Sequence, residues 1–315
     1  MIRLPSQLDT PAFLMSFPFT VDNRVPNNAW MEGERALPYH KPIAFRQWQA
    51  LYKELSARGV VWLLPAEGDF QDRPFVADVA CVMHHAPPFV AVSKLACEGR
   101  DGEEAAVRLF FASMGCTVCQ SPFPWQGEAD LKHITENVYI GGWGQRSTLI
   151  AFAWMRDAFG ADIVTVELTA PKAYHLDALL FPLGGQKALV ATSAFQSGDL
   201  RKIEQCVDII EVPKHCVYDN WTNCVLIGDM VLHNPTSAES ASELSTLLEK
   251  HGFWLRTIDL SEFDLSGAAL SCLVMHLNDK NRQTDAERWR QADLVDRDNG
   301  WGDAQTRIRT AFSER

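Results

Sequence analysis

The sequence lacks two features that would have pointed to particular classes of partner. It has no apolar run of the ~18 residues that a transmembrane helix requires. It also has no basic excess: 29 Lys and Arg stand against 40 Asp and Glu, a formal net charge of −11. Nucleic-acid-binding domains normally present a basic face. We therefore expect neither a membrane nor a nucleic-acid partner, whereas a small cationic substrate is compatible with this charge.

Secretion and metal-binding patterns are also missing. Pro5, Pro11 and Pro18 interrupt the apolar start, which does not resemble a signal peptide. The 8 cysteines have irregular spacing, and the single pair Cys116 and Cys119 has no second pair. These features are typical of reduced thiols, so we expect a cytoplasmic protein. No cluster of His, Cys and Asp has the spacing of a metal site, so no metal and no cofactor are expected.

What the sequence does contain is a repeat of roughly 45 to 52 residues, a period typical of propellers and related arrays. Each copy has two short apolar segments, an amphipathic helix, and a third strand. Four copies are expected at 79–83, 89–92, 103–114 and 117–119; at 131–134, 138–140, 149–159 and 163–166; at 178–181, 188–191, 200–206 and 209–212; and at 225–227, 230–233, 239–251 and 254–258. The four copies predict four similar αβ units.

A fifth unit is divided between the two ends of the chain. It begins at 269–276, and an N-terminal helix at 45–58 with a strand at 60–64 completes it. This arrangement predicts one closed α/β propeller with five-fold pseudosymmetry and ββαβ units at residues 1–278. The alternative is an open, doubly wound α/β sheet, which does not explain why the first helix and strand complete the last unit. A polar tail at 279–315 offers a surface for a homo-oligomer.

Polar clusters occur at corresponding junctions of the repeat. They are 72–78, 126–130, His175 with Asp177, Asn223 and Cys272. Residues at strand ends of a closed ring point into its centre, so the predicted fold brings these clusters together.

This ordered set of motifs resembles the guanidine-modifying, or pentein, superfamily. That group includes arginine deiminases, dimethylarginine dimethylaminohydrolases, arginine dihydrolases and amidinotransferases, all built on a propeller of five ββαβ units. The motifs that carry the resemblance are DRPFVADVACV at 72–82, CEGRDGEEAAV at 97–107, GGWGQRST at 141–148, YHLDALL at 174–180, and the glycine and cysteine of 267–272. The resemblance covers about residues 12–278.

The resemblance implies a catalytic role for a thiol, an imidazole and carboxylates. Cys272 is the implied nucleophile, and as a thiolate it adds to the guanidinium carbon. His175 is the implied general acid for the leaving amine and then the base for water. Asp78 and Asp177 would hold the planar cation, because carboxylates bind such a cation in a bidentate manner.

Further residues are implied as contacts for the rest of an arginine-like substrate. Arg100 and Arg146 are candidates for the α-carboxylate, and Asp72 is one for the α-amino group. The segment FLMSFPFTVDNRVPNNAWM at 13–31 most resembles the arginine dihydrolases, and Asn28 matches an asparagine that enters their active site. The QGEAD motif at 126–130 adds Asp130 to the expected binding residues.

One departure from the family pattern concerns the carboxylate that opens this last motif. The family usually has Glu-Gly-x-x-Asp, whereas this chain has Gln126 at the first position. A register change of the loop would present Glu128 in place of Gln126, and we expect Glu128 to be the catalytic carboxylate.

The implied activity is hydrolysis of arginine or a derivative, most similar to an arginine dihydrolase, which produces ornithine and ammonia. Deiminases and dimethylarginine hydrolases stop at citrulline, and amidinotransferases pass the amidino group to an amine. A non-enzymatic alternative is a propeller that only binds, such as a ribosome anti-association factor. Gln126 favours this alternative, and the joint presence of Cys272, His175, Asp78 and Asp177 argues against it.

Overall fold

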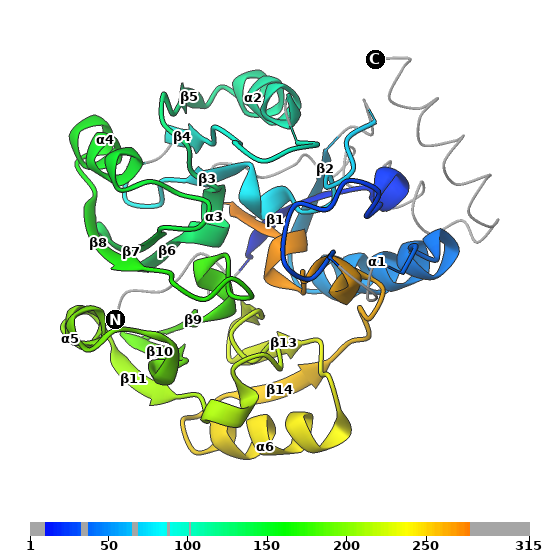
Figure 1. Cartoon of the computed structure of the whole chain (residues 1–315), viewed down its shortest axis with the longest axis vertical. Coiled ribbons are helices and arrows are strands. Elements are labelled where there is room, and N and C mark those ends of the chain that lie inside the picture. Colours follow the sequence, from blue (N-terminus) through cyan, green and yellow to red (C-terminus); the bar gives the residue numbers. More distant parts are fainter. Residues whose placement is uncertain (1–9, 33–36, 65–68, 87–88, 101, 278–315) are drawn as a thin grey trace.

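The computed structural model describes residues 10–32, 37–64, 69–86, 89–100 and 102–277. Within them, five sheets of three strands each surround a common centre, and the long helices lie on the outside of this ring (Figure 1). The predicted propeller is confirmed. None of the described helices is long and apolar enough to span a bilayer. The tail at 279–315 lies outside the described residues, so its role in a homo-oligomer stays a prediction.

Four of the sheets are each formed by one continuous stretch of chain. Their strands are β3 (Ala80–Val82), β4 (Phe89–Val92) and β5 (Thr117–Gln120); β6 (Leu131–Thr135), β7 (Val138–Trp143) and β8 (Asp162–Glu167); β9 (Leu180–Gly184), β10 (Lys187–Val190) and β11 (Asp208–Glu211); and β12 (Val225–Ile227), β13 (Met230–His233) and β14 (Trp254–Thr257). In each sheet the first strand is antiparallel to the second, and the second is parallel to the third.

A parallel pair needs a crossover connection, which is commonly a helix. The crossover helices of these sheets are α2 (Glu103–Ser113), α4 (Leu149–Phe159), α5 (Ser197–Glu204) and α6 (Ala238–Glu249). The short α3 (Gly127–Asp130) precedes β6 and lies near the centre of the ring (Figure 1). The repeat of the sequence therefore corresponds to one sheet and one outer helix per unit.

The fifth sheet joins the two ends of the described chain. Its central strand is β1 (Ala12–Ser16), which pairs antiparallel with β15 (Met275–Leu277) and parallel with β2 (Val60–Leu64). Helix α1 (Lys41–Ser56) connects β1 to β2. The prediction placed the first 40 residues outside the repeat, and for β1 this was wrong. All five residues of β1 are buried, because the strand lies between two others in the core.

Three units have a single turn before their first strand, where the sequence had suggested continuous strand. The turns are η4 (Val76–Asp78), η5 (Leu176–Ala178) and η9 (Ser271–Leu273). Cys272 therefore lies in a turn and not in a strand spanning 269–276, as predicted. The turns η4 and η9 are in contact, so the polar residues that they carry meet at the centre of the ring.

Candidate active site

Eight of the residues predicted from the sequence line one pocket near the centre of the ring. They are Asn28, Asp72, Asp78, Arg100, Gln126, Arg146, His175 and Cys272. The other three predicted residues, Asp130, Asp177 and Glu128, are not among the residues that line it. The pocket also includes the side chains of Asn27 and Tyr174. The ring therefore brings together most of what the sequence motifs predicted.

Cys272 is buried in η9 between an acid and an amide. Its thiol donates to Asp177 Oδ2 over 3.4 Å, and the Asn223 amide donates to its sulfur over 3.4 Å. Asn223 Oδ1 also accepts from the backbone N–H of Ser271 at 2.9 Å, which fixes the turn. Burial raises the pKa of the Cys272 thiol well above its ordinary value, and Asp177 and Asp78 raise it further. The thiol is therefore protonated when no substrate cation is bound.

His175 has one nitrogen committed to an amide and one directed at a carboxylate. Its Nε2 lies 2.6 Å from Oε1 of Gln126, and the Gln126 amide donates to Cys97 Sγ over 3.3 Å. An amide oxygen only accepts, so His175 carries its proton on Nε2. Nδ1 is then unprotonated, 3.7 Å from Asp78 Oδ1. Burial lowers the pKa of His175 to about 3, so the ring is a neutral base.

The expectation that Glu128 serves as the catalytic carboxylate was wrong in geometry. Glu128 accepts from the backbone N–H of His276 at 2.8 Å and pairs with its imidazole, in a second cavity of the protein. Two residues apart on a helical turn means about 200° around its axis, so Gln126 and Glu128 face opposite ways. Gly127 fixes this turn with φ +50°, because a Cβ there would lie 2.1 Å from Ala77 O. Gln126 therefore contacts the imidazole.

Arg100 is not available for a substrate carboxylate, contrary to prediction. Its guanidinium binds Asp78 Oδ2, and its Nη2 lies 2.8 Å from Glu103 Oε2. It also donates to the backbone oxygen of Phe75 at 3.3 Å. Burial raises the pKa of Glu103 to about 7 despite this cation. Arg100 therefore orients Asp78, whose Oδ1 is buried without a hydrogen-bond partner.

Asp72 and Arg146 both line the pocket and are linked through one residue. Asn27 donates its side-chain amide to Asp72 Oδ2 at 2.5 Å, and Arg146 donates to the Asn27 backbone oxygen. The guanidinium of Arg146 lies 5.1 Å from the ring centroid of Tyr174, a cation–π contact. Asp72 Oδ1 is buried without a hydrogen-bond partner. A free carboxylate oxygen and a cation are thus held in the same pocket.

Asn28 lies on an N-terminal segment that crosses the pocket. Its amide donates to the Ser266 backbone oxygen at 3.1 Å, and its Oδ1 accepts from the Trp30 N–H at 2.9 Å. The Trp30 indole donates to Lys172 O at 2.8 Å. Gly267 has φ +64° and packs under this indole, where a Cβ would lie 2.2 Å from the ring. The predicted Asn28 is therefore part of the pocket wall.

Asp130 has a structural place and does not face the pocket, which corrects the prediction that it binds substrate. The Ser147 hydroxyl donates to its Oδ2 at 2.6 Å, and the Leu176 N–H donates to its Oδ1 at 3.0 Å. Ser147 also accepts from the Gln126 N–H at 3.0 Å. Asp130 thus fixes the two segments that carry Gln126 and His175 against each other.

The sequence analysis did not single out several residues that touch the site. Cys97 orients the Gln126 amide, Asn27 holds Asp72, and Ser271 donates to Asp177 at 2.5 Å. Ser271 and Asn27 are neighbours of predicted residues, which is the only signal that the sequence offered for them. Cys97 lies three residues before Arg100 in a predicted motif, but a lone cysteine has no pattern of its own.

Comparisons with known proteins agree with this geometry. No family model matches the chain. The chain is 28% identical over 279 residues to the bifunctional arginine dihydrolase/ornithine cyclodeaminase AgrE of Nostoc sp., covering 86% of this chain and 38% of AgrE. It is 24% identical over 253 residues to the N(G),N(G)-dimethylarginine dimethylaminohydrolase of Mycobacterium tuberculosis, covering 80% of each.

A solved structure gives the same picture. The N-terminal domain of ArgZ, a cyanobacterial arginine dihydrolase crystallised with its product, superposes with a TM-score of 0.78 at 26% identity, covering 85% of this chain and 97% of that domain. The chain spans less than two fifths of the full length of AgrE. The five-sheet ring, the convergence of the ordered motifs on one pocket and these similarities point the same way: the chain belongs to the guanidine-modifying, or pentein, superfamily.

Proposed function

We propose that the chain hydrolyses the guanidinium group of arginine or of an arginine derivative through a covalent intermediate on Cys272. The observation that carries this proposal is the convergence of a buried thiol, a neutral imidazole and unpaired carboxylate oxygens at one pocket. A guanidinium offers N–H donors along its edges and an electrophilic carbon at its centre. The carboxylates suit the edges, and the sulfur suits the carbon.

In the first step, the substrate activates its own nucleophile. Asp78 and Asp177 together raise the pKa of the Cys272 thiol when no cation is present. A guanidinium bound to these carboxylates offsets their charge, which lowers the pKa of the thiol. The thiol proton passes to His175 Nδ1, and the sulfur adds to the guanidinium carbon.

In the second step, the protonated His175 gives that proton to the leaving nitrogen, and ammonia or an alkylamine departs. The C–N bond breaks and an S-linked amidino group remains on Cys272. His175 is neutral again, with Nδ1 free because Gln126 holds Nε2–H. It takes a proton from water, the hydroxide adds to the carbon, and the thiolate leaves with a ureido product.

The pocket has matching groups for the other end of arginine. The unpaired Asp72 Oδ1 suits an α-ammonium group, and Arg146 suits an α-carboxylate. Arg146 replaces the pair of arginines that the sequence suggested, because Arg100 is held by Asp78 and Glu103.

Ornithine and ammonia are the products that we infer first. The relatives named as arginine dihydrolases and the position of Asn28 in the pocket wall support a second hydrolysis of the ureido group. A variant of the ArgZ N-terminal domain has been crystallised covalently bound to a reaction intermediate, which supports a covalent route.

Citrulline is the second candidate product, and one observation favours it. Asp78 and Asp177 are both acceptors, whereas a ureido group is neutral and turns a carbonyl oxygen toward one of them. Two carboxylates therefore prefer the cationic substrate over the neutral product. Release after one hydrolysis would give the activity of a deiminase or of a dimethylarginine hydrolase.

Product analysis tests the proposal directly. The purified chain is offered arginine, methylated arginines and agmatine, and mass spectrometry distinguishes ornithine, citrulline and their decarboxylated analogues. Cys272→Ala is expected to abolish turnover with each substrate that the wild type accepts. Undiminished turnover in this variant would exclude Cys272 as nucleophile, and inactivity of the wild type on all substrates would favour a binding protein.

A further inference from the structure

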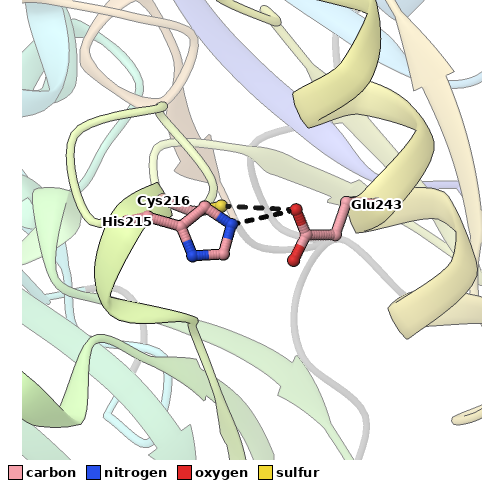
Figure 2. Close-up of side chains that lie close together, drawn as sticks. All are labelled: His215, Cys216 and Glu243. Atoms are coloured by element: carbon pink, nitrogen blue, oxygen red, sulfur yellow. Dashed lines mark hydrogen bonds and ion pairs between the residues drawn. The ribbon is translucent and has the colours of Figure 1, made fainter.

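Three side chains with metal-binding atoms meet outside the pocket just described. His215 and Cys216 belong to the turn η7 (Lys214–Cys216), and Glu243 lies on the facing side of α6 (Figure 2). Their donor atoms all lie within 4.8 Å of one another, and no other such group occurs among the described residues. The imidazole, thiol and carboxylate come from segments 27 residues apart, so the sequence spacing did not indicate a metal site.

The separations of these atoms match the edges of a small tetrahedral ion site. Zinc binds sulfur at about 2.3 Å, and nitrogen and oxygen at about 2.0–2.1 Å. In a tetrahedron these bonds place N and O about 3.3 Å apart, and S and O about 3.5 Å apart. His215 Nε2 lies 3.1 Å from Glu243 Oε2, and Cys216 Sγ lies 3.8 Å from the same oxygen. An ion fits with shifts of a few tenths of an ångström.

The surroundings favour a cation with access to water. The side chains of His215 and Glu243 are 70% and 45% exposed, whereas Cys216 is buried. Asp219 adds a second carboxylate that acts on the Cys216 thiol. Thiolate, imidazole and carboxylate form a donor set typical of zinc, in contrast to the all-oxygen sets of calcium and magnesium. Three protein ligands leave the fourth position of a tetrahedral ion to water.

We propose that His215, Cys216 and Glu243 form a binding site for a divalent zinc-type ion that fastens the β11–β12 loop to α6. This site goes beyond the proposed hydrolase function and does not depend on it. Cys216 binds as a thiolate, and its proton leaves to solvent. Solvent exposure of two ligands gives the ion a direct entry path.

The fastened loop leads to the nucleophile. Beyond the metal ligands it carries Trp221, whose indole donates to Ser240 Oγ on α6 at 2.8 Å. It then reaches Asn223, whose amide contacts Cys272 Sγ and the backbone of Ser271. The ion therefore adds a third point of attachment to the loop that orients Cys272.

The test uses the full chain, stripped with a chelator and titrated with Co²⁺ as a spectroscopic probe, followed by displacement with Zn²⁺. We expect one ion per chain, with the absorption bands of tetrahedral cobalt and a thiolate-to-cobalt charge-transfer band. Cys216→Ser should remove the charge-transfer band. His215→Gln and Glu243→Gln should weaken binding by more than the 10- to 100-fold that loss of an outer-shell partner typically costs.

Two control variants separate this site from other thiols. Cys206→Ser alters a half-buried thiol near the end of α5, and Cys272→Ala removes the nucleophile. Both should keep the bands. Binding that survives Cys216→Ser, or that is lost in Cys272→Ala, would overturn the proposal. His215→Gln changes an exposed side chain, so this variant decides the matter if Cys216→Ser fails to fold.

Hydrogen exchange gives a readout of the attachment itself. Zn²⁺ should slow amide exchange across 213–224 in the wild type and leave it unchanged in His215→Gln. Zinc binding at the assigned ligands without any change of exchange in this loop would overturn the fastening role.

Discussion

At the scale of single residues, Gln126 sets the protonation behaviour of His175. Its amide oxygen accepts from Nε2 and leaves the imidazole without a negative partner on that side. Burial then lowers the pKa of His175 to about 3. A carboxylate in contact with an imidazole stabilises the protonated form and raises the pKa by about 1–3 units.

Gln126→Glu is therefore expected to raise the pKa of His175 and to increase kcat, because the imidazolium is the acid that releases the amine. A pH–rate profile and an NMR titration of His175 measure both effects. Glu128→Gln is the matched control, since Glu128 faces the second cavity. A shift of the profile in the control, with none in Gln126→Glu, would contradict the assignment.

Cys272 should react selectively with cationic reagents. Burial, Asp177 and Asp78 raise the pKa of its thiol, so iodoacetamide should modify it slowly at neutral pH. A haloacetamidine carries its own cation and should react faster. Asp177→Asn removes one carboxylate, so it should speed the neutral reagent and slow the cationic one. Mass spectrometry of the modified peptide follows each rate. Equal rates with both reagents would mean that the carboxylates do not control this thiol.

At the scale of elements, the turn of α3 decides which side chain reaches the imidazole. Gly127 has φ +50° and would clash with Ala77 O if it carried a Cβ, whereas Gly228 has φ +60° and open space around it. Gly228→Ala should cost about 1–2 kcal/mol of unfolding free energy for its left-handed backbone. Gly127→Ala adds steric overlap and should cost about 3 kcal/mol or more.

Urea unfolding measures both costs, and turnover shows whether the turn has moved. Gly127→Ala should also lose activity, because α3 positions Gln126 against His175. Equal stability losses in the two variants would mean that the turn can shift away from Ala77 without penalty.

Much of the ring could be predicted from sequence because each unit repeats the same order of apolar segments and helix. The predicted C-terminal glycines of three helices, Gly115, Gly160 and Gly252, indeed have positive φ. Strand β1 was missed because its five buried residues AFLMS are too few to show a period and lie near Pro11 and Pro18. The turn η9 was missed because its residues are as apolar as a strand.

The candidate site was predictable where motifs carried it and unpredictable where packing decided. Sequence cannot tell which face of a single helical turn contacts a distant histidine, so Glu128 was chosen over Gln126. Nor can it show that Arg100 spends its donors on Asp78 and Glu103, since these contacts depend on how η4 and α2 meet.

At the scale of the whole molecule, buried histidines should make stability depend on pH. Burial lowers the pKa of His233 to about 4 and that of His175 to about 3. The unfolded chain protonates histidines near pH 6.5, so it binds more protons than the folded chain below that pH. The unfolding free energy should therefore fall as the pH drops from 6.5 toward 4, by about 1.4 kcal/mol per pH unit for each histidine.

His233→Gln isolates one of these contributions. The difference in unfolding free energy between wild type and variant should change by about 1.4 kcal/mol per pH unit in this window. Asp264 acts in the opposite sense, because burial raises its pKa to about 6 and its contribution is lost as the pH rises. It is present in both proteins and cancels. Parallel pH curves for the two proteins would show that His233 is protonated in the folded state.

The fifth sheet has a consequence for how the chain matures on the ribosome. β1 is synthesised among the first residues, yet its antiparallel partner β15 ends at Leu277. Throughout elongation β1 therefore keeps one edge without its native neighbour, and the nascent chain must avoid mispairing there. The segment that finally covers this edge also delivers Cys272. No partly translated chain that ends before this segment can carry the nucleophile, so reactivity arrives with ring closure.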